Sequence, residues 1–596
     1  MITLTPRRTP AESDLSPDLR GRGYRLAMAL SRARGAPLAI FWSLVVAILV
    51  LPIALFLLVA FSPRLLSQGP QWISLTGFRE ALSGPLLHAA LDSLMVGILS
   101  AAAATTIGFA TAWLVLRTDV PARGLWTGGM FALLLAPSYL VALGWERLLE
   151  PSGVLDIIGI GAGTVRHSFY GPVGIVVVLT TKGVPFAYLA ISNALRGLGE
   201  ELEMAVRVHG GRARDAGRIV VSLLAPAVWS ALAIVFAESI SDFGVAATLA
   251  NDAHFPIATF TLYNAVDNFP INFPVAAAIG WILMTMAGLA LACQSRALRG
   301  RCYRVIGGRT RPARRQRLHA PARAAALAGL SLLLLVGLGI PAFGALSASL
   351  IKDLGSLASS HGLTLSNYRR ALDSPALREP LLFSARLAAI TATLTTVVGA
   401  VSARVLADRS SRLSARVLDL LLLTAVALPG IVFAAGYIFT YNLPAANALG
   451  LHLYETTTLL VLAYLATALP ATARVLLGPF GQVQHSLGEA GRVHGDGSGA
   501  AWVRTVLPVL IRPLLSAWIL TYCATLLELP VSQLLYPPNH PPISVGITKA
   551  LANYDFGGGT AMEVIAILFA LAVVAVAWGL FALIAPAGWR KLGRSR

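Results

Sequence analysis

The chain has 596 residues, of which 56% are apolar and only 13% are charged. Soluble globular proteins carry roughly 25% charged residues, so this composition excludes a soluble enzyme and a disordered chain. The net charge of +19 would suit either nucleic acid or the cytoplasmic loops of a membrane protein, and the positions of the cations decide between the two.

Apolar runs dominate the chain. A bilayer core about 30 Å thick is crossed by about 20 apolar residues in a helix. Runs of that length lie at 37–62, 88–116, 125–149, 170–195, 219–249 and 270–295, and again at 322–349, 382–407, 417–441, 453–479, 510–536 and 561–587. They predict an all-α polytopic membrane protein with about 12 transmembrane helices. Prolines such as Pro137 and Pro429 are tolerated in spanning helices.

Basic residues recur wherever the chain returns to one side. With the N-terminus inside, 36 of the 47 lysines and arginines fall in inside segments. This positive-inside pattern argues against nucleic-acid binding, because the cations form no single basic domain. It predicts a cytoplasmic N-terminal tail (1–36), a basic cytoplasmic linker (296–321) and a cytoplasmic C-terminal tail (588–596), so both termini are expected in the cytoplasm.

The two regions between these segments, 37–295 and 322–587, look like copies of each other. Residues 75–82 (LTGFREAL) match 365–372 (LSNYRRAL), and 207–210 (RVHG) match 492–495 (RVHG). Further pairs follow in the same order: Ser93 and Ser384, Gly108 and Gly399, Pro137 and Pro429, Gly144 and Gly436, Asp242 and Glu528. Six spans per copy predict two parallel repeats with a pathway along the axis between them.

The loops after the fourth span of each copy are long and look helical. In the second loop, Ser486 and Glu489 have the spacing of a capping box. Gly495 suits a left-handed helix end, and Leu507-Pro508 should stop the loop before the next span. An ordinary amphipathic loop helix is the alternative, but two such loops at equivalent positions favour docking elements.

Residues 489–495 (EAGRVHG), followed thirteen residues later by Pro508, resemble the EAA loop of binding-protein-dependent ABC importer permeases. The resemblance covers nearly the whole chain, as two fused permease domains. It implies that each loop docks on a separate cytoplasmic ATPase, two copies in all, and that a periplasmic or extracellular binding protein delivers the solute. It gives the coupling role to Glu203, Ala205, Arg207 and Gly210 in the first loop and to Glu489, Ala490, Gly495, Leu507 and Pro508 in the second. The first loop departs further, with Met204 in the place of the glutamate and Leu223 in that of the proline.

Motifs for chemistry are missing from the sequence. It has no GxxxxGK[ST] motif, so ATP is expected to be used by the partner subunit, and no cofactor is expected on this chain. Its three cysteines form no spaced pair and its histidines do not cluster, so neither a metal site nor a catalytic residue is expected.

Ionisable residues inside spans are functional hypotheses by default. Glu238 and Asp242 lie in the fifth span and Glu528 lies at the matching point of the eleventh, so these acids would face each other across the axis near its outer mouth. The alternative is that they sit at the water interface or pair with a neighbouring helix. Trp145 and Tyr437 occupy equivalent positions and are expected to be interfacial anchors.

The cargo is less defined. Residues 241–249 (SDFGVAATL) and 528–538 (ELPVSQLLYPP) look most like iron(III) importer permeases. Related permeases carry thiamine, 2-aminoethylphosphonate or polyamines. The sequence therefore predicts the permease subunit of an importer in the bacterial cytoplasmic (inner) membrane, with iron(III) as the first choice of cargo. The rival class is a secondary transporter with parallel repeats, which would not need docking loops.

Overall fold

The computed structural model describes residues 38–64, 68–151, 154–298, 315–352, 362–408, 412–426, 428–495 and 497–584. These residues are helical apart from loops and two isolated β-bridges. Among them, nine helices are long and apolar enough to cross a membrane, or up to twelve if each of three bent helix pairs is one span. The prediction of an all-α membrane protein with about twelve spans is confirmed. The two tails lie outside the described residues.

The first half, residues 38–298, begins with a helix from Leu38 to Val59 whose last part is α2. Its helices are α2 (Leu51–Val59), α3 (Thr76–Ala81), α4 (Gly84–Arg117), α5 (Arg123–Leu135), α6 (Ser138–Leu149), α7 (Val154–Ile157), α8 (Gly163–Phe169), α9 (Pro172–Arg196), α10 (Glu200–Val208), α11 (Ala213–Leu223), α12 (Ala225–Ser241), α13 (Ala258–Asp267) and α14 (Phe273–Leu298).

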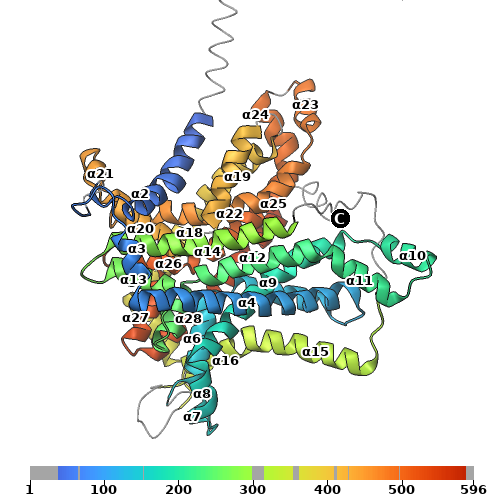
Figure 1. Cartoon of the computed structure of the whole chain (residues 1–596), viewed down its shortest axis with the longest axis horizontal. Coiled ribbons are helices and arrows are strands. Elements are labelled where there is room, and N and C mark those ends of the chain that lie inside the picture. Colours follow the sequence, from blue (N-terminus) through green and yellow to red (C-terminus); the bar gives the residue numbers. More distant parts are fainter. Residues whose placement is uncertain are drawn as a thin grey trace, which may run out of the picture.

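The second half, residues 315–584, repeats this order (Figure 1). Its helices are α15 (Ala320–Leu334), α16 (Ile340–Leu350), α17 (Ser366–Asp373), α18 (Pro375–Ala407), α19 (Arg412–Val426), α20 (Gly430–Tyr441), α21 (Pro444–Ala448), α22 (Thr457–Gln482), α23 (His485–Val493), α24 (Ser498–Ala501), α25 (Leu507–Leu526), α26 (Pro530–Leu535), α27 (Ile543–Ala552) and α28 (Phe556–Ile584). The two π-helical turns that matter below are η3 (Ala246–Ala250) and η5 (Trp502–Val506).

Equivalent hydrogen bonds demonstrate the duplication. In the first half, the backbone N–H of Ala258, at the start of α13, donates to Ser93 Oγ on α4 at 2.9 Å. In the second half, the N–H of Ile543, at the start of α27, donates to Ser384 Oγ on α18 at 2.8 Å. The repeat predicted from Ser93 and Ser384 is therefore a repeat of three-dimensional structure.

The first span of each half packs against the other half. Helix α2 lies against α20, and α16 lies against α6. At both crossings a glycine allows close backbone approach: a Cβ on Gly436 would lie 2.9 Å from the Pro52 carbonyl oxygen, and a Cβ on Gly144 would lie 2.4 Å from that of Pro341. No side chain fits at these distances. The glycines at these equivalent positions thus hold the halves together.

Two aromatic side chains complete the same crossings. The Tyr437 hydroxyl is buried and donates to the carbonyl of Ile48 at 2.8 Å. The Trp145 indole N–H donates to the carbonyl of Val336 at 3.2 Å. The prediction that these two aromatics are anchors at the membrane–water interface is wrong. Their polar atoms instead donate hydrogen bonds to the backbone of the first span of the other half.

The third span of each half is sharply bent. Helices α5 and α6 meet at 95°, and α19 and α20 meet at 104°. The bends lie at Pro137 and Pro429, each of which caps the helix that follows. The sequence predicted continuous spans at 125–149 and 417–441, so these two spans are broken where only a tolerated proline was expected.

The fifth span differs between the halves. In the first half α11 and α12 meet at a 48° bend, whereas in the second half one helix runs from Gly499 to Leu526 through α24, η5 and α25. The first of these spans ends directly before Asp242 and the second ends two residues before Glu528, whereas Glu238 lies inside α12. The apolar runs predicted at 219–249 and 510–536 therefore each contain a break near their end.

The described end of the linker lies beside a loop of the first half. The N–H of Gln316 donates to the carbonyl of Arg117 at 2.8 Å, and the N–H of Leu318 donates to Asp119 Oδ1 at 3.0 Å. With the N-terminus inside, the loop between the predicted spans 88–116 and 125–149 falls on the same side of the membrane as the linker, so this contact agrees with the predicted topology. Residues 299–314 lie outside the described part.

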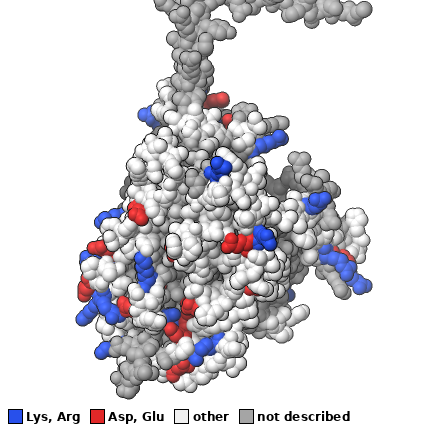
Figure 2. All heavy atoms as spheres, turned by 60° about the vertical axis from the view of Figure 1, so that its left-hand side comes forward, with Lys and Arg blue, Asp and Glu red and all other residues white. Residues whose placement is uncertain are grey.

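Much of the described surface is uncharged. Figure 2 shows a face that is mostly uncharged, with scattered charged side chains that are most frequent at its lower left. Long helices expose large apolar side chains, for example Ile98 on α4 and Leu568 on α28. Such surfaces are expected where spans face lipid.

Candidate functional site

A cavity of about 360 Å³ lies between the two halves and is lined by both. Its walls include the breaks of both third spans, at 137–139 and 428–430, and the ends of both fifth spans, at 241–244 and 527–530. Each pair of breaks is in contact: the backbone of Gly244 lies against Ser138, and Pro530 lies against Gly430. Four interruptions in helices thus meet around the central axis.

Three acidic side chains and one lysine line this cavity: Glu238, Asp242, Glu528 and Lys182. Glu238 is exposed, whereas the other three are partly buried. The cavity thus brings together all three acids singled out in the sequence, with three carboxylates against one ammonium group.

Asp242 and Glu528 perform the same local task in the two halves. Asp242 Oδ1 accepts from the Val245 N–H at 2.8 Å. Glu528 Oε1 accepts from the Val531 N–H at 2.8 Å, and its Oε2 accepts from the Ser532 N–H at 3.0 Å. Each carboxylate therefore caps the helical turn that follows the break in its span.

Hydroxyl groups hold the backbone of both acids from the other side. The Thr259 hydroxyl on α13 donates to the Asp242 carbonyl at 3.1 Å, and the Ser544 hydroxyl on α27 donates to the Glu528 carbonyl at 2.5 Å. Because α13 and α27 are themselves fixed to α4 and α18, each break is tied to a rigid neighbour.

Lys182 was missed by the sequence interpretation. Its ammonium group donates to the carbonyls of Leu134 and Ala136 at 2.9 and 2.7 Å, where Pro137 ends the hydrogen-bond ladder of α5. The equivalent residue of the second half, Thr467, also lines the cavity but is uncharged. A lysine inside the apolar run 170–195, in a chain with only four lysines, was the signal that could have identified it.

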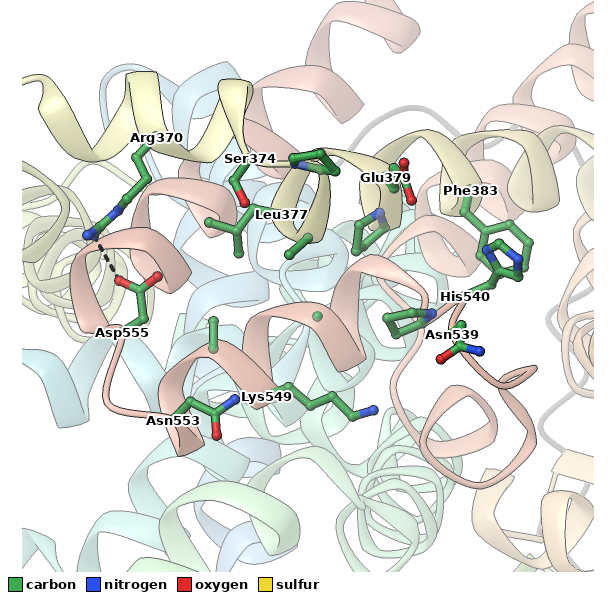
Figure 3. Close-up of a pocket in the computed structure, with 16 residues that line it drawn as sticks. Arg370, Ser374, Leu377, Glu379, Phe383, Asn539, His540, Lys549, Asn553 and Asp555 are labelled. Atoms are coloured by element: carbon green, nitrogen blue, oxygen red, sulfur yellow. Dashed lines mark hydrogen bonds and ion pairs between the residues drawn. The ribbon is translucent and has the colours of Figure 1, made fainter.

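A second cavity, of about 480 Å³, lies within the second half alone (Figure 3). Arg370 and Asp555 form an ion pair at 2.8 Å at one end, and the rings of Phe383 and His540 lie 5.9 Å apart at the other. Because no residue of the first half lines it, this cavity does not lie on the axis between the repeats.

The two predicted docking loops form helical hairpins, built on α10–α11 and on α23–α24. Gly210 and Gly495 adopt positive φ angles of 76° and 90°, the left-handed conformation predicted for Gly495. The Nδ1–H of His209 donates to the Ala205 carbonyl, and that of His494 donates to the Ala490 carbonyl, both at 2.8 Å. The loops thus end their first helix in the same way.

The capping box predicted in the second loop is wrong. Helix α23 begins at His485 with Gln484 as its N-cap, and no side chain caps it. Ser486 therefore lies inside the first turn, two residues too late to act as the N-cap. Glu489 is exposed. Gly491, where the family pattern has alanine, permits close packing, because a Cβ there would lie 2.8 Å from Ala501 Cβ.

Leu507-Pro508 does not stop the second loop. The helix continues through both residues, with the π-helical turn η5 directly before them. A π-helical turn shifts the hydrogen-bond register, which helps a helix to accommodate the missing N–H of Pro508. The sequence predicted that the loop helix would end at Leu507-Pro508. The structure instead joins the loop to its span through a continuous helix.

Exposed valines at the loop tips were also missed. Val208 and Val493, both within the repeated RVHG motif, are 83% and 84% exposed. Glu203 and Arg207 lie in α10, but their side chains are outside the described part of the chain. Both loops nonetheless present an apolar side chain at the same position, beside the residues assigned to coupling.

Comparison with known proteins supports the assignment. No family model matches the chain. The chain is 22% identical over 483 residues to the ferric transport system permease protein FbpB of Actinobacillus pleuropneumoniae, covering 78% of this chain and 67% of that protein. It is 24% identical over 430 residues to the putative ferric transport system permease protein FbpB 1 of Haemophilus influenzae, covering 70% and 65%. It is also 28% identical over 196 residues to the molybdenum transport system permease protein ModB of Escherichia coli, covering 31% and 80%.

The matched regions thus span about two thirds of the length of the two ferric permeases, and because they cover 78% and 70% of this chain, each includes part of both halves. Together with the membrane-spanning helices, the similarity to these transport permeases supports an integral membrane transport subunit of the ABC permease type.

Proposed function

We propose that this chain forms the translocation pathway for iron(III) across the bacterial cytoplasmic membrane. The observation that carries the proposal is the central cavity, in which carboxylates from both halves, Glu238 and Asp242 from one and Glu528 from the other, line one space. Hard metal cations prefer oxygen ligands such as carboxylates.

The charge of the cavity favours a cation over an oxyanion. Unlike charges attract more strongly in a site of low dielectric than in water. Three carboxylates outnumber the Lys182 ammonium group, which is already engaged with two carbonyl oxygens. Molybdate, the kind of cargo suggested by the name of ModB, would meet net repulsion here.

Iron is preferred among cations because two similar permeases are named as ferric transport proteins. Thiamine and polyamines are also cations, so the carboxylates alone do not separate them from iron, whereas the phosphonate group of 2-aminoethylphosphonate would be repelled. The external binding protein sets much of the specificity in the family that this chain resembles.

Partners are proposed from the loops. The hairpins at α10 and α23 each offer an exposed valine and a fixed left-handed glycine, which suits two copies of a cytoplasmic ATPase that uses ATP on behalf of this chain. A solute-binding protein would deliver cargo at the opposite end of the bundle. A secondary transporter would not need two such hairpins.

Uptake in the native bacterium tests the cargo. Deletion of the gene should reduce uptake of radioactive iron(III) but not of molybdate, and the wild-type gene should restore it. Glu238→Gln should restore less than half of the uptake, because it removes a cavity charge. Glu379→Gln, an exposed acid that lines only the second cavity, is the matched control and should restore uptake fully. Unchanged iron uptake after deletion, with loss of thiamine or polyamine uptake, would contradict iron as the cargo.

Topology is tested separately. Both termini and the linker are proposed to be cytoplasmic. Cys302, which lies in the linker outside the described residues, should resist an impermeant thiol reagent in intact spheroplasts and react after lysis. Labelling from outside would overturn the orientation.

A further inference from the structure

Each half carries a short exposed apolar segment before its long second span, and that of the first half includes α3, which lies at the end of the bundle away from α10 in Figure 1. The segments are residues 72–82, which include α3, and residues 362–372, which include most of α17. Equivalent apolar side chains have nearly equal exposed fractions: Ile73 83% and Leu363 82%, Leu75 61% and Leu365 64%, Leu82 50% and Leu372 50%. The exposure is thus a repeated property of the fold.

The backbone of both segments is held in the same way. The N–H of Thr76 donates to Ser74 Oγ at 3.2 Å, and the N–H of Ser366 donates to Thr364 Oγ1 at 3.0 Å, so the same hydroxyl turn begins each helix. On the inner face, Ala81 and its equivalent alanine are completely buried. The apolar side chains are therefore held outward by an ordered backbone.

Each segment rests on the end of a long span. A Cβ on Gly77 would lie 2.7 Å from the Pro274 carbonyl oxygen at the start of α14. In the second half, a Cβ on Gly557, at the start of α28, would lie 2.7 Å from the side chain of Asn367. Helices α4 and α18 begin immediately after the segments. Both segments thus lie at the level where spans leave the membrane.

The surroundings have the composition of a membrane interface. The exposed apolar surface continues onto the spans, for example at Leu91 on α4 and Ile390 on α18, each about half exposed. Arg79 and Arg369 are exposed within the segments, and Trp72 is exposed in the first. Aromatic and basic residues beside apolar ones are typical of peptides that lie in the headgroup region.

We propose that residues 72–82 and 362–372 are paired interfacial anchors, which insert their apolar side chains among the lipids of the leaflet opposite the coupling loops. The occupant of this surface is lipid, because the exposed apolar residues are continuous with the lipid-facing sides of α4 and α18. The anchors hold the ends of α4, α14, α18 and α28 at a fixed depth. This inference does not depend on the identity of the cargo.

Depth-dependent fluorescence quenching tests the anchors. In the full-length chain with its three cysteines replaced by serine, Ile73→Cys and Leu363→Cys each carry an environment-sensitive NBD label, and the protein is reconstituted in phosphatidylcholine vesicles. Asn447→Cys, on the exposed helix α21 at the same end of the bundle, is the matched control. Labels at 73 and 363 should be quenched at least about twofold more by lipids with a nitroxide near the headgroup than the control label, and less by aqueous iodide.

Quenching by iodide equal to that of the control, at either position, would overturn the proposal. It would also be overturned if the labels became protected only after a binding protein was added, because the surface would then belong to a protein partner. If the first variants do not assemble, Leu75→Cys and Leu365→Cys provide the same comparison.

Discussion

The two predicted docking loops, the hairpins at α10–α11 and α23–α24, present nearly the same tip but are joined to their spans in different ways. Gly210 and Gly495 share the left-handed conformation, and the neighbouring histidines make the same hydrogen bond. Behind the tip, however, the first loop reaches its span through a 48° bend, whereas the second continues as one helix from Gly499 to Leu526. A displacement of the second tip is therefore transmitted rigidly toward Glu528, and a displacement of the first can be absorbed at the bend.

The largest effect is expected from breaking the continuous helix. Val503 and Arg218 are equivalent exposed positions in η5 and α11. Proline inside a helix costs about 3 kcal/mol or more at either site. We expect Val503→Pro to reduce uptake by about tenfold or more, because tenfold corresponds to only about 1.4 kcal/mol. Arg218→Pro should reduce uptake only two- to threefold, roughly, since its loop is already bent.

Both variants are compared at equal membrane abundance, with uptake and ATPase rate measured together. Equal losses at the two positions would show that the bend in the first loop transmits motion as well as the straight helix does.

The next effect is expected at the left-handed glycines. A side chain in this conformation costs roughly 1–2 kcal/mol. No neighbouring atom would clash with a Cβ at Gly210 or Gly495, so the strain is confined to the backbone. Gly495→Val should uncouple ATP hydrolysis from uptake more severely than Gly210→Val. The ratio of transported solute to ATP hydrolysed measures this difference, and a larger loss in the first loop would reverse the comparison.

A smaller and more equal effect is expected in the cavity, where the halves resemble each other most. Asp242→Asn keeps an oxygen for its capping N–H group, and Glu528→Gln keeps one of the two oxygens that accept capping N–H groups; both changes remove the charge. Each variant should reduce uptake about three- to fivefold, which corresponds to roughly 1 kcal/mol. Each should still assemble with the ATPase subunits. Unchanged uptake in the double variant would leave both carboxylates with only their structural capping role.

The smallest effect is expected at the loop glutamates. Because Glu489 is exposed and α23 has no side-chain cap, Glu489→Ala should not unfold the helix. We expect uptake to fall about twofold, as for the loss of one exposed polar contact. Circular dichroism and thermal unfolding of the variant should match the wild type. A marked loss of helix stability would restore the capping role that the sequence suggested.

Periodic features were the most predictable from sequence. The spans, the parallel repeat and the meeting of Glu238, Asp242 and Glu528 in one region followed from apolar run lengths and equivalent positions. The breaks at Pro137 and Pro429 did not, because a proline in a span can be tolerated, can kink the helix or can end it, depending on neighbours. The packing of each first span against the other half could not be predicted either. Because the two halves are similar, the sequence offers each first span two similar partners.

Helix boundaries and the roles of single residues could be predicted less reliably from the sequence. The Ser486 capping box failed because the helix begins at His485, and the pattern alone does not fix the first helical residue. Leu507-Pro508 was taken as a stop, although a π-helical turn can carry a helix through a proline. Lys182 was overlooked among apolar neighbours, although a lysine inside a span is a strong signal for function.

The central claim is that this chain is a pathway subunit driven through both coupling loops by an ATPase. The most direct measurement is native mass spectrometry of the complex purified from its own membrane by a tag on this chain, repeated with Val208→Asp and Val493→Asp. We expect two ATPase subunits per chain in the wild type and one in each single variant. A chain that purifies without an ATPase, yet transports its solute alone in liposomes, would contradict it.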